Sequence, residues 1–199
     1  IQTDLLEISL SPAFKQALAD HTLCDLGEGV APYRPRYILP DYRILMKKGC
    51  AFLGLTPPQD IWEACNSLLI FYKHVPSITS FPVWLGNLPE LLEPFHKEEA
   101  ETRKALKMFL LHIDKTLTDS FVHANIGPKD SPVARIILDL TKEMQLAIPN
   151  LSLIYDPEQT SDDFALACID CMLATSKPSF SNHVMYRAGG IGEYGIASC

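Results

Sequence analysis

The last residue of the sequence, Cys199, is the side chain with the clearest capacity for chemistry. It follows the small and apolar residues 195–198 (Gly-Ile-Ala-Ser), and residues 189–192 (Gly-Gly-Ile-Gly) come shortly before them. Small side chains let a backbone approach a ligand closely, and reactive thiols are typically carried by loops on a rigid scaffold. Residue type and context therefore make Cys199 a candidate catalytic thiol on a glycine-rich loop.

A hydrolase built on this thiol would need a histidine beside it as a base. His183 is the histidine nearest to Cys199 in the sequence. It could instead orient a substrate or transfer a proton, and a polar position in a loop without function is an equally good interpretation. The residues alone leave these alternatives open.

Two further thiols, Cys168 and Cys171, form a Cys-x-x-Cys motif. A zinc site would need more ligands, and the sequence has no second Cys-x-x-Cys. Both cysteines fall on the apolar face of a helical pattern at residues 160–174, so we expect them to pack in the core. His112 and His123 lack the spacing of metal ligands, so no metal site is expected.

The elements that must position these side chains alternate between strand and helix patterns from about residue 80 onward. Strands are expected at residues 81–85, 121–126, 151–155 and 178–181, and helices at 98–119, from 131 onward and at 160–174. This alternation predicts parallel strands joined by right-handed crossovers, hence an α/β layer or barrel. It does not distinguish a barrel from an open sheet.

A boundary is expected near Pro76, which should end a helix that starts after residues 56–58 (Thr-Pro-Pro). Residues 1–76 would then form a mainly helical N-terminal portion, with a first helix starting at Ser11 and Pro12. Residues 77–199 would form the α/β portion that ends in the cysteine loop.

Composition narrows the class of protein. The 199 residues are 47% hydrophobic, which suffices for one sizeable core, and the net charge is −7 without any run of Lys or Arg. This charge argues against a nucleic-acid partner and favours a small-molecule substrate or a protein partner. No apolar run of roughly 18 residues predicts a membrane span. Six cysteines in so core-rich a chain are typical of reduced thiols in a cytoplasmic protein.

Residues 149–199 resemble, in order, the approach to the active-site cysteine of glycyl radical enzymes of the pyruvate formate-lyase class. The matching pieces are residues 149–152 (Pro-Asn-Leu-Ser), residues 178–179 (Pro-Ser) with Asn182, and residues 196–199 (Ile-Ala-Ser-Cys). They cover about a quarter of the chain. Residues 75–79 and 81–86 are similar to the YjjI-type branch of the same superfamily.

The resemblance implies a ten-stranded α/β barrel in which loops carrying a cysteine and a glycine meet. A separate radical-SAM activating enzyme, which uses S-adenosylmethionine, would install a radical on the glycine. The glycyl radical would take a hydrogen atom from Cys199, and the resulting thiyl radical would act on a small polar substrate. Ser198, Asn182 and His183 would contact this substrate, no metal would be bound, and a homodimer is compatible with the resemblance.

Two departures from the family pattern refine this expectation. Formate-lyases place two adjacent cysteines here, whereas Ser198 precedes Cys199. A lyase, dehydratase or reductase acting through a substrate radical is therefore expected rather than cleavage of pyruvate. Residues 187–191 (Arg-Ala-Gly-Gly-Ile) lack the valine and the aromatic residue of the radical-glycine motif, so we expect a loop there. The radical glycine would lie outside this chain, which alone would be inactive. The alternative is a non-catalytic barrel that serves as a binding or scaffold protein.

Overall fold

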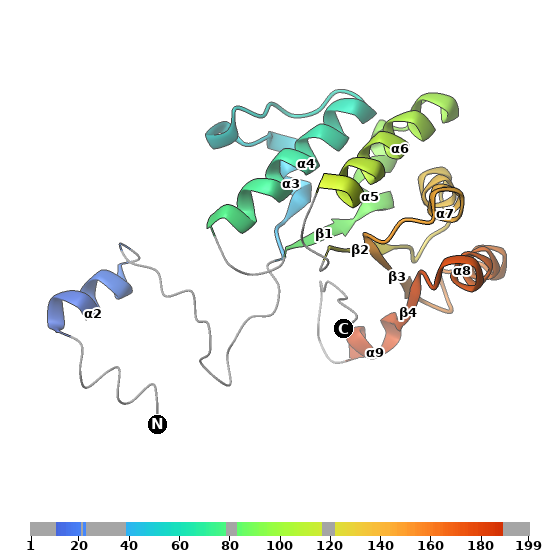
Figure 1. The fold of residues 1–199 in the computed structure, drawn as a ribbon. Helices are drawn as coiled ribbons and strands as arrows, with labels where there is room; N and C mark the ends of the chain where they lie inside the picture. The colour runs from blue at the N-terminus through green and yellow to red at the C-terminus, as the bar shows by residue number, and fades with distance from the viewer. Residues whose placement is uncertain (1–10, 21, 23–38, 79–82, 117–121, 189–199) are drawn as a thin grey trace.

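The computed structural model describes residues 11–20, 22, 39–78, 83–116 and 122–188. Parallel strands alternate with helices through most of these ranges, as the sequence predicts (Figure 1). In chain order the elements are α2 (Pro12–Ala19), α3 (Tyr42–Lys48), η1 (Ala51–Leu53), α4 (Ile61–Ile78), β1 (Trp84–Asn87), α5 (Leu88–Leu92), η2 (Glu93–Phe95), α6 (Glu99–Thr116), β2 (His123–Ile126), α7 (Pro132–Met144), β3 (Asn150–Tyr155), α8 (Asp162–Thr175), β4 (Ser179–Asn182) and α9 (His183–Ala188).

The described strands form one parallel sheet in the order β1-β2-β3-β4, so each strand lies beside its neighbour in the chain. His123 is paired with Asn150, and Ser152 with Ser179, which sets the register across β2, β3 and β4. The α/β class is confirmed. A parallel sheet with sequential strand order is consistent with part of a barrel.

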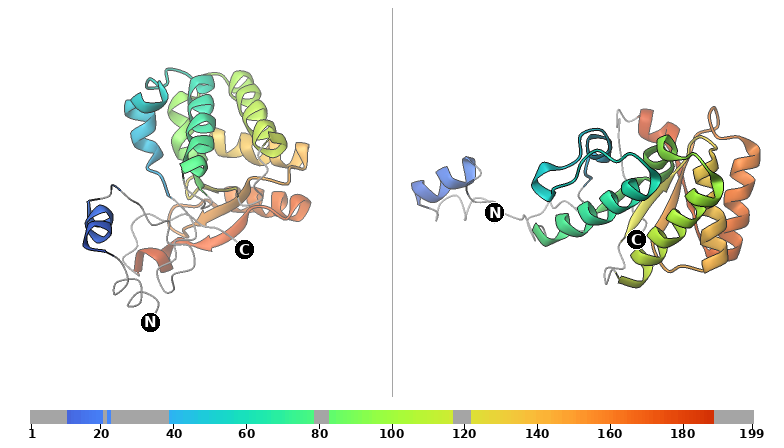
Figure 2. Two further views of the ribbon diagram at one scale, coloured as in Figure 1. Left: turned by 60° about the vertical axis from the view of Figure 1, so that its left-hand side comes forward. Right: turned by 90° about the horizontal axis from the view of Figure 1, so that it is seen from above.

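Helices α4, α6, α7 and α8 gather on one face of this sheet (Figure 2). Alternate residues of the strands, among them Leu85, Ile126 and Leu153, point into this helical layer and belong to one buried cluster. Phe109 of α6 and Phe164 of α8 are among the largest fully buried side chains of that cluster. Burial of this apolar surface is the main force that holds the helices on the sheet.

Local sequence explains where two of the crossover helices begin. Ser131 precedes Pro132, and its hydroxyl accepts a hydrogen bond from the Ala134 amide at 3.2 Å. Ser161 caps α8 in the same way through the amide of Phe164. Serine caps satisfy amides that have no partner within the helix, and proline suits the first helical turn.

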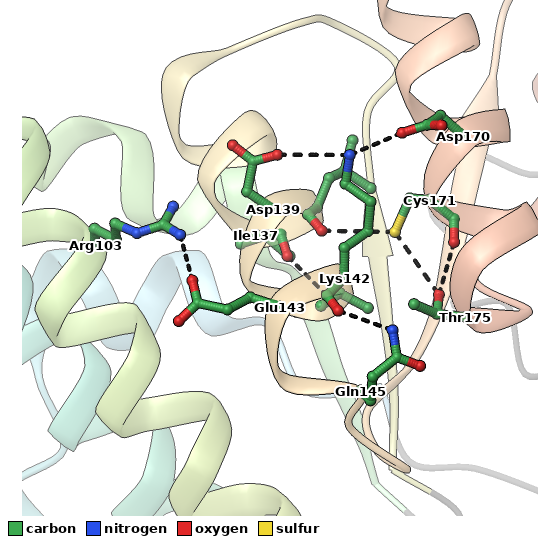
Figure 3. Close-up of polar contacts among 11 residues, drawn as sticks. Arg103, Ile137, Asp139, Lys142, Glu143, Gln145, Asp170, Cys171 and Thr175 are labelled. Carbon is green, nitrogen blue, oxygen red and sulfur yellow. Dashed lines mark hydrogen bonds and ion pairs between the residues drawn. The ribbon is translucent and has the colours of Figure 1, made fainter.

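Polar side chains also connect the helices to one another on the outer surface (Figure 3). Arg103 of α6 contacts Glu143 of α7, and Lys142 of α7 lies 2.8 Å from Asp170 of α8. Such exposed ion pairs each contribute little, typically below about 1 kcal/mol. The buried apolar layer beneath them therefore carries most of the stability.

The end of one helix differs from the sequence-based expectation. The helix expected to stop at Pro76 continues to Ile78, because four turns with buried residues fix α4 before the proline is reached. The boundary proposed near residue 76 thus falls inside α4, which packs against α6. The first described strand, β1, starts at Trp84, and residues 81 and 82 of the strand expected at 81–85 lie outside the described residues.

None of the helices in the described ranges has the length and apolar content that a membrane span requires.

Candidate functional site

The carboxyl ends of the four strands lie at one edge of the sheet, because all strand pairs are parallel. Asn87 ends β1, Gly127 follows β2, Asp156 follows β3 and His183 follows β4. In parallel α/β folds, ligands bind at this edge, where the loops diverge from the strands. A ligand-binding site is therefore expected at these four positions.

A cavity of about 260 Å³ lies at this edge. Residues from or next to all four strands line it, namely Asn87, Pro128, Ile154 and His183. Tyr42 and Arg43 of α3 contribute the opposite wall. The cavity thus joins the sheet to the N-terminal helical portion, and we refer to it as the strand-end pocket.

Gly86 belongs to the lining of the strand-end pocket and has a positive φ of 96°. A Cβ atom at this position would lie 2.6 Å from Cδ1 of Leu91 and 3.1 Å from Cδ2 of Tyr42. Glycine therefore allows the backbone of β1 to approach α3 and α5 closely.

The sheet face opposite the helices is polar. His123 and Asn125 of β2 and Ser152 of β3 alternate with the residues that enter the helical core, and all three have no exposed surface. The hydroxyls of Ser152 and Ser179 are 2.8 Å apart, which joins β3 to β4 across this face. Buried polar groups are costly unless they are hydrogen-bonded, so a polar inner face in an otherwise apolar core indicates a functional surface.

His183 is the first residue of α9 and lines the strand-end pocket. Asn182 ends β4, and its side-chain oxygen accepts hydrogen bonds from the amides of Val184 at 3.1 Å and Met185 at 3.4 Å. Asn182 thereby fixes the start of α9, a role that the sequence does not reveal. Residues 187 and 188, expected to lie in a loop, belong instead to α9, and the rest of the expected loop lies outside the described residues.

Asp156 anchors the other end of α9. Its carboxylate is fully buried, lies 3.0 Å from the guanidinium of Arg187, and accepts hydrogen bonds from the Glu158 amide and the Gln159 side chain. The Glu158 amide lowers the pKa of Asp156 most, burial opposes it, and Gln159, Arg187 and His183 lower it further. The carboxylate is therefore ionised at neutral pH and holds α9 against the end of β3.

Cys199 and Ser198, the remaining residues expected at the site, lie outside the described residues. The segment that carries them follows α9, whose first residue lines the pocket.

Cys168 and Cys171 are fully buried on α8, which confirms the prediction of core packing. Burial raises the pKa of Cys168 to about 12 and also raises the pKa of Cys171. Thiols with raised pKa values are poor nucleophiles and poor metal ligands. Among the described residues, no group of three or more His, Cys, Asp or Glu side chains could hold a metal ion.

Sequence reasoning missed Asn87, His123, Asp156 and Arg187. These residues could have been found from their position in the sequence, because a polar residue at the end of a buried strand in an α/β pattern lies at the ligand-binding edge of the sheet. The apolar pattern marked the strands themselves, but it gave no reason to single out the polar residues at their ends.

Comparisons with known proteins point to one family. A family model described as "Glycyl radical enzyme YjjI-like" matches residues 2–199. An uncharacterized protein of Haemophilus influenzae is 50% identical over 182 residues, which are 92% of this chain and 35% of that protein. The uncharacterized protein YjjI of Escherichia coli is 43% identical over 190 residues, which are 93% of this chain and 36% of that protein. The chain thus spans about a third of the length of these relatives. No solved structure matches it.

Proposed function

Because the chain belongs to the YjjI-like glycyl radical enzyme family, we propose that it contributes the first part of a ten-stranded barrel in which Cys199 carries a thiyl radical. The reaction would convert a small polar molecule by a lyase, dehydratase or reductase route. Ser198, Asn182 and His183 are the proposed substrate contacts.

The observation that carries this proposal is the two-faced sheet. Four parallel strands follow one another in chain order, with helices on one face and buried polar residues on the other. In a closed α/β barrel the helices cover the outside, and the opposite face of the sheet lines the interior. A polar interior suits a barrel that encloses a polar substrate.

The position of α9 supports a role for the segment that follows it. The helix starts directly after β4, is capped by Asn182 and is paired through Arg187 with Asp156. Two fixed ends give this short helix a defined direction at the strand-end pocket. The segment that carries Cys199 therefore follows a helix that is held at both ends, and functional loops are typically positioned by such a rigid scaffold.

The proposed chemistry is a series of hydrogen-atom transfers to and from the sulfur of Cys199. Cys199 would give its thiol hydrogen atom to a glycyl radical outside this chain, leaving an unpaired electron on sulfur. The sulfur would then take a hydrogen atom from the substrate, and the product radical would recover it from the thiol. The radical-SAM activating enzyme that installs the first radical is a proposed partner, and a homodimer is a proposed assembly.

A test of this proposal does not require the substrate. The full-length protein is activated in D₂O, where the Cys199 thiol carries deuterium. If this thiol exchanges hydrogen with the glycyl radical, deuterium replaces the remaining hydrogen on the glycine α-carbon, and the splitting that this hydrogen causes in the electron paramagnetic resonance spectrum collapses. A Cys199→Ala variant should form the radical and keep the splitting, whereas Cys168→Ala should behave as the wild type.

Retention of the splitting in the wild-type protein would overturn the role of Cys199. A protein that gives no radical at all with its activating enzyme would favour the second candidate, a non-catalytic barrel that binds ligands or partners. The replacement of the first of two family cysteines by Ser198 is the observation in favour of that candidate.

A further inference from the structure

The charged residues of the strand-end pocket indicate which charge its ligand can carry. Its charged side chains in the described part of the chain are Asp41, Arg43 and Glu90, and the imidazole of His183 also lines it. Arg43 lies 3.4 Å from the carboxylate of Asp41 and 3.8 Å from that of Glu90. The guanidinium is thus already flanked by two carboxylates, and this part of the lining offers an incoming anion no surplus of positive charge.

The deeper part of the pocket offers hydrogen bonds instead. Asn87 is only 9% exposed, and its side-chain nitrogen donates to the Gly127 carbonyl at 2.6 Å. Its side-chain oxygen and the indole nitrogen of Trp84 are both buried, and neither has a hydrogen-bond partner among the described residues. Both residues line the strand-end pocket. A buried acceptor and a buried donor without partners are costly, and a ligand that pairs with both would recover that cost.

We propose that the strand-end pocket binds an uncharged small molecule that both donates and accepts hydrogen bonds, such as an amide or an alcohol, and that it rejects carboxylates and phosphates. The ligand would donate to the Asn87 oxygen and accept from the Trp84 indole. The inference rests on the proposed function, in that this ligand would be the substrate or a part of it.

The physical reason for the rejection is desolvation. An anion that enters this partly buried pocket gives up water, Asp41 and Glu90 repel it, and the described lining offers it no guanidinium or ammonium that is not already paired. An uncharged ligand gives up less hydration and gains two hydrogen bonds. Molecules of similar size and shape that carry an amide in place of a carboxylate should therefore bind more tightly.

Two such pairs are lactamide with lactate and glycolamide with glycolate. Full-length protein labelled with fluorotryptophan is titrated with each probe and followed by fluorine NMR. The resonance that is missing from a Trp84→Phe variant identifies Trp84. We expect the amides to shift this resonance and the carboxylates to leave it in place.

Affinities measured by calorimetry test the individual residues. Trp84→Phe keeps an aromatic ring but lacks the indole donor, so it should weaken amide binding roughly fivefold. Trp62→Phe is the matched control, because Trp62 lies on α4 outside this pocket and should leave binding unchanged. Glu90→Gln removes one of the two carboxylates and should allow measurable binding of lactate.

Equal or tighter binding of the carboxylates by the wild-type protein would overturn the inference, as would amides that never move the Trp84 resonance. The radical exchange in D₂O needs no ligand and is measured on the same preparation. If that exchange occurs while the probes fail, the ligand class is wrong and the proposed function stands. If the exchange fails while the amides bind, the ligand class stands and the role of Cys199 is wrong.

Discussion

The guanidinium of Arg187 lies 3.0 Å from the carboxylate of Asp156, which has no exposed surface. This pair joins the loop after β3 to the last turn of α9 and therefore connects the third strand to the segment that leads to Cys199. The Arg187 side chain is 44% exposed, so water would solvate its charge if Asp156 were lost, whereas loss of Arg187 would leave a buried carboxylate without its cation.

We expect Asp156→Asn to loosen α9 without unfolding the sheet. The substitution keeps the shape of the side chain but removes the charge that holds Arg187, so hydrogen exchange of residues 183–188 should speed up at least several-fold. Glu158→Gln is the matched control, because Glu158 is exposed and lies 4.0 Å from the same guanidinium. Equal exchange in the two variants would show that Asp156 does not position α9.

The same carboxylate should make stability depend on pH in the acid range. The pKa of Asp156 is lowered from its ordinary value of 3.8, chiefly by the Glu158 amide. The ionised form is thus favoured in the folded state, and its contribution is present above the unfolded pKa and lost as pH falls through the folded pKa. Urea unfolding followed between neutral pH and below pH 3.8 should show this loss in the wild type. If the free energy of unfolding of Asp156→Asn fell by a similar amount over the same pH range, the loss would come from other carboxylates.

A second clamp lies at the opposite edge of the sheet, where Asp114 holds the loop between α7 and β3. One of its oxygens accepts from the amides of Ala147 at 2.8 Å and Ile148 at 3.0 Å, and its side chain is 2% exposed. Asp114→Ala leaves these two amides without their acceptor, so the free energy of unfolding should fall by about 1–3 kcal/mol. Chemical denaturation measures this loss.

Asp170→Ala provides the comparison for that measurement. It removes the exposed ion pair with Lys142 on the outer surface (Figure 3) and should cost less than about 1 kcal/mol. A larger loss for Asp170→Ala than for Asp114→Ala would contradict the assignment of the two contacts.

The buried thiols should be chemically inert in the folded protein. Burial raises the pKa of Cys65 and of Cys168 to about 12, so neither forms an appreciable amount of thiolate near neutral pH. Iodoacetamide should modify them only after unfolding, whereas the half-buried Cys50 provides an internal comparison. Mass spectrometry of peptides identifies each site, and rapid labelling of Cys168 in the native state would reveal local opening of α8.

The crossover helices and strands could be predicted because their signals are local. Ser131 with Pro132 marks one helix start, and the apolar pattern of residues 160–174 places the start of another within two residues; the structure confirms both helices. The burial of Cys168 and Cys171 also follows from a periodicity that spans one helix.

The candidate site could be predicted only in part, because its contacts join distant residues. Nothing near Arg187 in the sequence indicates that its partner is Asp156, and the pairing appears only once α8 has crossed back over the sheet. The strand-end pocket also depends on residues that are distant in the sequence, because Tyr42 of α3 and His183 of α9 both line it. The sequence argued only against His123 as a metal ligand, and its place on the polar face of β2 follows from the register of the sheet.

The strand order β1-β2-β3-β4 has a consequence for biosynthesis. Each strand finds its partner one crossover earlier in the chain, so the pairings close short loops and the contact order is low for a parallel sheet. A ribosome that releases the chain from its N-terminus delivers these units in the order in which they pack. The described strands can therefore assemble during translation by successive addition at one side of the growing sheet.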